Sequence, residues 1–156
     1  MGHDYRPQSD MDEFWMSQAL LCARKAKAVD TAFSVGCVII DSREQQIVTS
    51  GYSRQFDGNT HAEECALSQL EEKTREHLVL YTTMEPCSQR LSGKKSCVQR
   101  IIASRIPRVV FGCREPRIFV ECNGADQLKQ AGIQVDFLKE FESSCLQVNS
   151  HLIPQT

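Results

Sequence analysis

A histidine and a glutamate lie two residues apart in the stretch GNTHAEECAL (58–67), and two cysteines follow further along the chain. His61, Cys87 and Cys97 offer one imidazole and two thiolates, which are enough for a catalytic zinc site that keeps water at its fourth position. A carboxylate beside such a site, here Glu63, can carry protons without binding the metal. The pattern predicts zinc-dependent hydrolytic chemistry, with Glu63 as the general acid and base.

The same glutamate has a simpler interpretation. Thr60 and Glu63 have the spacing of a capping box at a helix start, and this stretch alone favours the cap. The later cysteines favour the chemistry. Neither His77 nor Cys113 is close enough in sequence to be required as a fourth ligand, which a closed structural zinc site would need.

Apolar periodicity and turn residues predict alternating strands and helices around these residues. The expected helices are 10–29, about 61–72, 97–105, 124–132 and 140–152, and the expected strands are 33–41, 44–53, 77–87, 108–113 and 133–138. This order indicates a three-layer α/β/α fold with a five-stranded, mainly parallel central sheet. Ligands bind at the carboxyl ends of such strands, so the stretch MEPC (84–87) is expected at that edge.

Composition limits the class of protein. The chain has 156 residues and a formal charge of −2, which indicates one domain (10–150) between a flexible segment (1–9) and a tail (151–156). No basic field favours nucleic acid, and no apolar run is long enough to cross a membrane. The polar N-terminus is unlike a signal peptide, which favours a cytoplasmic protein, or a nuclear one.

Eight cysteines in such a chain indicate metal binding or catalysis more than disulfides. Free cysteines usually pack as small hydrophobic residues, and six without metal-like spacing are expected to be structural: Cys22, Cys37, Cys65, Cys113, Cys122 and Cys145.

The ordered pattern His-x-Glu, Pro-Cys, Cys resembles the cytidine deaminase-like superfamily. Most members have two residues between the cysteines, whereas nine separate Cys87 from Cys97 here, as in pyrimidine deaminases of riboflavin synthesis. The stretches TAFSVGCVI, SGYSRQFDGNTHAEECAL and YTTMEPCSQRLSGKKSCVQRIIA are similar to the fungal DRAP deaminase family. Bacterial relatives carry Asn-Pro before the Val-Gly that corresponds to Val35-Gly36, and TAFSVG departs from that pattern.

This resemblance implies zinc-dependent removal of the 2-amino group of 2,5-diamino-6-ribitylamino-4(3H)-pyrimidinone 5'-phosphate, with release of ammonia, in riboflavin biosynthesis. It also implies a homodimer. The chain is also compatible with being part of a longer protein.

Substrate contacts are expected from the loops that flank the metal ligands. The candidates are Ser53, Arg54, Asn59, Ala62, Ser88, Arg90, Ser92, Lys94 and Lys95. The four cations are candidates for the phosphate, although charged loops are usually only solvated. Asn59 has an equally good role in a turn, and the backbone of Ala62 lies at a helix start where N–H groups are unpaired. Phe33 or Tyr52 would stack on the pyrimidine, with core packing as the alternative for Phe33.

Two other functions remain open. One is another zinc deaminase, acting on a nucleotide, a nucleobase or tRNA adenosine; the charge and the long loop between the cysteines do not favour tRNA. The other is a non-catalytic zinc-binding module, which Glu63 argues against.

Overall fold

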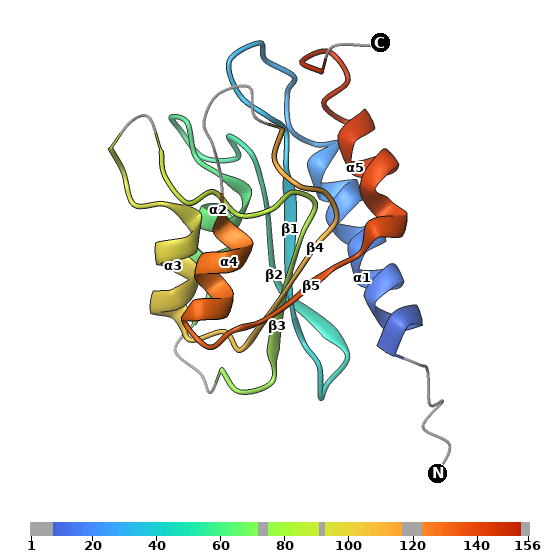
Figure 1. Cartoon of the computed structure of the whole chain (residues 1–156), viewed down its shortest axis with the longest axis vertical. Helices are drawn as coiled ribbons and strands as arrows, with labels where there is room; N and C mark the ends of the chain where they lie inside the picture. Colours follow the sequence, from blue (N-terminus) through green and yellow to red (C-terminus); the bar gives the residue numbers. More distant parts are fainter. Residues whose placement is uncertain (1–7, 72–74, 91–92, 117–122, 154–156) are drawn as a thin grey trace.

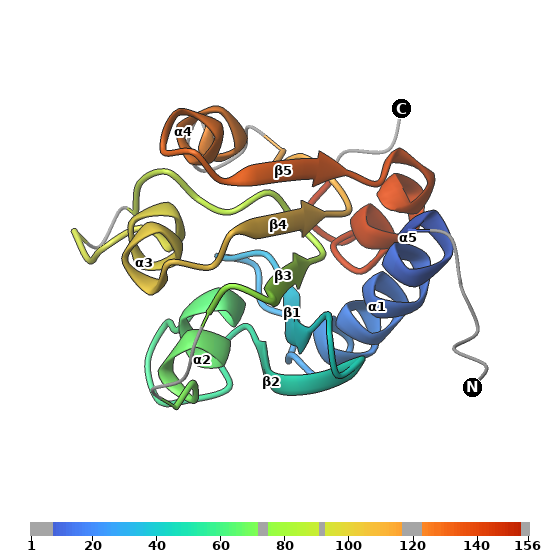
Figure 2. The same ribbon diagram turned by 90° about the horizontal axis from the view of Figure 1, so that it is seen from below.

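A five-stranded sheet lies between two layers of helices in the computed structural model, which describes residues 8–71, 75–90, 93–116 and 123–153 (Figure 1). The helices are α1 (Gln8–Ala23), α2 (Ala62–Ser68), α3 (Cys97–Ser104), α4 (Gly124–Gln130), the 3-10 turn η1 (Lys139–Phe141) and α5 (Glu142–Gln147). The strands are β1 (Gly36–Asp41), β2 (Gln46–Tyr52), β3 (Leu78–Thr82), β4 (Arg108–Phe111) and β5 (Gln134–Phe137). Figure 2 shows α1 and α5 on one face of the sheet and α2, α3 and α4 on the other, which confirms the predicted α/β/α fold.

The strand order is β2-β1-β3-β4-β5. Strand β1 is antiparallel to both of its neighbours, while β3, β4 and β5 pair in parallel. Four of the five strands therefore run in one direction and β1 alone runs against them. The sheet is mainly but not entirely parallel.

The central strands are apolar because both of their faces are covered. Every residue of β3 is buried, as are the first five of β1. One core cluster lies between the sheet and α1 and α5, and includes Trp15, Met16 and Tyr81. A second lies between the sheet and the helices of the other face, and includes Ile101 of α3 and Leu128 of α4. Five of the six cysteines expected to be structural are buried, and Cys122 lies outside the described residues.

Gly51 lets α2 lie directly on β2. A Cβ atom at this position would come within 2.4 Å of the Ala62 carbonyl oxygen and 2.7 Å of the Ala66 nitrogen. Such distances are too short for any other side chain, so glycine fixes the depth at which the start of α2 meets the sheet.

Some boundaries differ from those expected from the sequence. Helix α1 begins at Gln8, so Asp10 lies in its first turn instead of capping it. Of the segments expected to be flexible or a tail, 1–7 and 154–156 lie outside the described residues. Within the expected tail, the imidazole Nε2 of His151 lies 3.0 Å from the carbonyl oxygen of Val29.

No helix in the described ranges combines the length and apolarity needed to cross a membrane.

Candidate active site

Three elements bring one imidazole and two thiols together at the carboxyl ends of the strands. His61 precedes α2, Cys87 follows β3, and Cys97 is the first residue of α3. Their ligand atoms all lie within 4.8 Å of one another. Nδ1 of His61 is 3.3 Å from Sγ of Cys97 and 3.6 Å from Sγ of Cys87. A tetrahedral zinc ion with ordinary bond lengths separates its nitrogen and sulfur ligands by about 3.6 Å, so these side chains fit zinc.

The start of α3 favours a thiolate at Cys87. Ser96 caps the helix by accepting a hydrogen bond from the Gln99 backbone N–H (3.1 Å). The Cys97 backbone N–H then donates to the sulfur of Cys87 (3.3 Å). Hydrogen bonds from the Cys97 thiol, from His61 and from this N–H lower the pKa of Cys87 to about 4, against the effect of burial. The pKa of Cys97 is raised because its thiol donates to Cys87 and is buried.

Helix α2 is capped one residue later than the sequence indicates. Its N-cap is His61, whose backbone N–H donates to Oε1 of Glu64 (3.2 Å), so the alternative capping box of Thr60 with Glu63 does not form. The Thr60 hydroxyl instead bonds the backbone of Phe56, accepting from its N–H (3.3 Å) and donating to its carbonyl (3.1 Å). Glu64 therefore takes the capping role, and the carboxyl of Glu63 turns inward.

Glu63 lies against the predicted metal ligands and is only 3 % exposed. Its Oε1 accepts a hydrogen bond from the Thr82 hydroxyl at the end of β3 (2.5 Å), and its Oε2 lies 3.4 Å from Sγ of Cys97. Burial raises the pKa of Glu63, although the Thr82 hydrogen bond and the charge of His61 oppose this. One oxygen is therefore fixed by the sheet, and the other faces the metal ligands.

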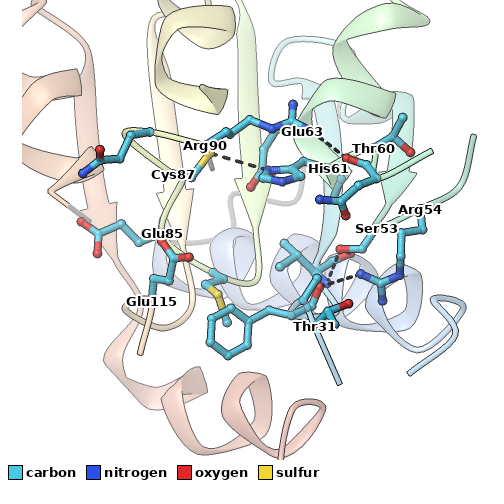
Figure 3. A pocket seen from close by; sticks show the side chains of 17 residues that line it. Thr31, Ser53, Arg54, Thr60, His61, Glu63, Glu85, Cys87, Arg90 and Glu115 are labelled. Carbon is cyan, nitrogen blue, oxygen red and sulfur yellow. Dashed lines mark hydrogen bonds between the residues drawn. The ribbon is translucent and has the colours of Figure 1, made fainter. Parts of the chain in front are cut away.

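A pocket opens in front of these residues (Figure 3). It has a volume of about 140 Å³ and is lined by His61, Glu63 and Cys87. Five of the residues predicted to contact substrate also line it: Ser53, Arg54, Asn59, Ala62 and Arg90. Phe33 belongs to the core cluster, as the core-packing alternative predicts, and also lines the pocket, whereas Tyr52 only packs against that core.

Both arginines of the pocket are already held by the protein. Arg54 donates to the carbonyl oxygens of Phe33 (3.1 Å) and Lys27 (2.8 Å), so its guanidinium organises the neighbouring loop. Arg90 donates to Glu64 (2.9 Å) and to the carbonyl oxygen of Asn59 (2.7 Å). Phosphate contacts from these side chains stay predictions.

Three of the remaining predicted contacts, Ser88, Lys94 and Lys95, are not among the residues that line the pocket. The Ser88 hydroxyl accepts a hydrogen bond from the Asn123 backbone N–H (3.3 Å), and Lys94 and Lys95 are exposed. Ser92 lies outside the described residues.

Several pocket residues were not predicted. They are Thr31, Ala32, Val35, Met84, Glu85, Gln89 and Glu115. Met84 and Glu85 stand within MEPC, and Thr31, Ala32 and Val35 within TAFSVG, so their stretches were noticed but not the individual residues. Nothing in the sequence indicates Glu115.

Residues 9–113 match the family described as the cytidine and deoxycytidylate deaminase zinc-binding region. The chain is 46% identical over 138 residues to the diaminohydroxyphosphoribosylamino-pyrimidine deaminase of Schizosaccharomyces pombe, covering 86% of this chain and 34% of the relative. It is 36% identical over 125 residues to the riboflavin biosynthesis protein RibD of Escherichia coli, covering 80% and 33%. The chain thus spans about a third of the length of these curated relatives.

The fold is similar to that of the Aspergillus oryzae Rib2 deaminase in complex with DARIPP. The TM-score is 0.77 at 32% identity, and the match covers 88% of this chain and 89% of that one. The predicted resemblance to deaminases of riboflavin biosynthesis is therefore confirmed by sequence and by fold.

Proposed function

Because this chain belongs to the zinc-binding family of cytidine and deoxycytidylate deaminases, we propose that it is a zinc-dependent pyrimidine deaminase of riboflavin biosynthesis. The substrate is 2,5-diamino-6-ribitylamino-4(3H)-pyrimidinone 5'-phosphate, which loses its 2-amino group as ammonia. Similarity to the S. pombe deaminase and to the A. oryzae enzyme in complex with DARIPP supports this choice over other deaminase substrates.

The observation that carries the proposal is the position of Glu63 beside His61, Cys87 and Cys97. Zinc held by these three side chains supplies a water molecule that deprotonates near neutral pH. Oε2 of Glu63, the oxygen that faces the ligands, takes the proton from the attacking water. The carboxyl delivers this proton to a ring nitrogen as C2 gains a hydroxyl group. It then takes the proton of that hydroxyl and transfers it to the amino group, so that the C–N bond breaks, ammonia leaves and C2 becomes a carbonyl.

The rest of the pocket orients the pyrimidine. Thr82 fixes the unreactive oxygen of Glu63, so the carboxyl cannot rotate away from the reaction centre. Phe33, which is buried and lines the pocket, offers an aromatic face to the ring. The phosphate is bound by cations of the flanking loops, with Arg54 and Arg90 as the two that line the pocket.

A substrate panel tests this proposal. The purified protein is loaded with zinc, and ammonia release is measured from the diaminopyrimidine phosphate, dCMP, cytidine and guanine. We expect turnover of the diaminopyrimidine phosphate alone. Turnover of cytidine or dCMP without it rejects the substrate, and no turnover of any compound by the zinc-loaded protein favours a non-catalytic module.

The proposal includes a homodimer, as the resemblance implies, and a cytoplasmic location, as expected from the sequence. Light scattering on the purified protein tests the dimer. A mass equal to one chain contradicts it.

A further inference from the structure

One wall of the pocket is an irregular segment between α1 and β1. Thr31, Ala32, Phe33 and Val35 line the pocket, and residues 33–35 belong to no helix or strand. Irregular backbone at a buried site must find hydrogen-bond partners outside a sheet or helix. The position of this wall therefore depends on the side chains that bind its backbone.

Side chains from three separate connecting segments accept hydrogen bonds from three successive backbone N–H groups, those of residues 34–36. The Ser34 N–H donates to Oδ1 of Asn149 (2.6 Å) and the Val35 N–H to Oγ of Ser53 (2.8 Å). The next N–H, that of Gly36, donates to Oγ1 of Thr83 (3.1 Å). Ser53 follows β2 and Thr83 follows β3, whereas Asn149 lies in the turn after α5, 115 residues from its partner.

Asn149 binds both backbone groups of Ser34 through two different side-chain atoms, whereas Ser53 contacts those of Val35 through one hydroxyl, which accepts from the N–H (2.8 Å) and donates to the carbonyl (3.4 Å). Nδ2 of Asn149 donates to the carbonyl oxygen of Ser34 (3.0 Å) while its Oδ1 accepts from the same residue. Asn149 is 1 % exposed and Ser34 is 2 % exposed, so water cannot replace either bond. The pairing also fixes which way the amide faces, because the reverse orientation would oppose donor to donor and acceptor to acceptor.

Arg54 holds the wall from the pocket side. Its guanidinium donates to the carbonyl oxygen of Phe33 (3.1 Å) and to the Ser34 hydroxyl (3.0 Å). Figure 3 shows Arg54 and Ser53 reaching this wall from one side. Asn149 does not line the pocket, so it acts from behind, and Ser34 is held between Asn149 and Arg54.

We propose that Asn149 is a positioning residue for substrate binding, which fixes the Thr31–Val35 wall through its two hydrogen bonds to Ser34. This inference rests on the proposed function, because it assigns to that site the wall against which the pyrimidine packs. His61, Glu63, Cys87 and Cys97 are held by α2, β3 and α3. Loosening the wall therefore alters substrate binding more than metal binding or proton transfer.

The test compares Asn149→Ala with Gln147→Ala, which removes an exposed side chain from the end of α5, two residues before Asn149. For Asn149→Ala we expect kcat/KM for the diaminopyrimidine phosphate to fall about 10- to 100-fold, mostly through KM, as for a misplaced binding group. Zinc content should stay at the wild-type value. Gln147→Ala should match the wild type in kcat/KM, in KM and in zinc content.

Asn149→Asp extends the test if the alanine variant does not fold. It keeps the acceptor for the Ser34 N–H and loses the donor to the carbonyl, so its KM should also be raised. Kinetic constants equal to those of Gln147→Ala in either folded variant overturn the proposal. So does a parallel loss of zinc and kcat, which would indicate general damage.

Hydrogen exchange separates this proposal from the proposed function. In Asn149→Ala, or in Asn149→Asp if the alanine variant does not fold, amides of residues 31–36 should exchange faster than in the wild type, while those of 62–68 keep their rates. If the wild type lacks activity on the diaminopyrimidine phosphate, the proposed function fails. The positioning role of Asn149 is overturned separately, if the amides of residues 31–36 exchange in the variant at the wild-type rate.

Discussion

Glu64 supports the site without facing it, and its replacement by glutamine should destabilise the protein strongly. The carboxylate receives Arg90 at 2.9 Å and Arg100 at 3.3 Å. The Arg90 side chain is only 2 % exposed, whereas that of Arg100 is 30 % exposed. Glutamine keeps an oxygen for the His61 N–H but removes the one carboxylate that pairs with the buried Arg90 guanidinium in the described part of the chain.

The expected cost of Glu64→Gln follows from this burial. Removing one partner of a buried ion pair costs about 3–5 kcal/mol. We expect about 3 kcal/mol here, because the glutamine oxygen still accepts a hydrogen bond from Arg90. Arg100→Met should cost less than about 1 kcal/mol, because the Arg100 guanidinium is partly open to water and Glu64 keeps Arg90 as its partner.

Urea unfolding of the zinc-loaded proteins measures both values. The slope of unfolding free energy against urea concentration should be the same in each variant, so that a difference in midpoint reports a difference in stability. Equal costs for Glu64→Gln and Arg100→Met would refute the reasoning. Such a result would mean that Arg90 finds water or another acceptor once the carboxylate is gone.

Two further predictions concern hydroxyl groups of β3. Thr82→Val removes the donor to Oε1 of Glu63 and should lower kcat about tenfold or more while zinc content is unchanged. Steady-state kinetics and metal analysis measure the two quantities. An unchanged kcat would mean that the hydroxyl does not hold the carboxyl in place. The pKa of Tyr81 is raised by burial and by its hydrogen bond to Asp12, so the native state favours the neutral phenol. The stability from this preference is complete below about pH 10, the pKa of tyrosine in the unfolded chain, and is lost as pH rises above it. The urea concentration at the unfolding midpoint should therefore fall less steeply with alkaline pH for Tyr81→Phe than for the wild type. An equal dependence on pH in the two proteins would contradict the raised pKa of Tyr81.

The order and type of the elements could be predicted because the signals are local. The apolar strands β1 and β3 and the short helix α3 are visible in short stretches of sequence. The predicted zinc ligands could be recognised because His61, Cys87 and Cys97 carry unusual side chains in a recognisable order.

The start of α2 was misassigned because two local rules competed. Thr60 is a good N-cap by type, but its hydroxyl closes the loop with Phe56. With His61 as the N-cap, Glu64 occupies the third helical position, where its side chain completes the capping box. Only the folded loop decides between these pairings.

The back of the pocket could not be predicted, because it depends on contacts distant in sequence. Asn149 bonds Ser34 across 115 residues, and no pattern near either residue indicates the other. The sequence predicts Arg54 and Arg90 as candidates for the substrate phosphate, whereas the fold supplies acceptors for both from other segments.

The central claim is that Glu63 transfers the protons of a zinc-dependent deamination. The most direct measurement is ammonia release from the diaminopyrimidine phosphate by Glu63→Gln and by the wild type, at equal and verified zinc content. Glutamine keeps an acceptor for Thr82 but cannot exchange a proton, so turnover should fall by a factor of about 10²–10⁴ or more while zinc and the melting temperature are retained. Turnover within a few-fold of the wild type would contradict the assignment.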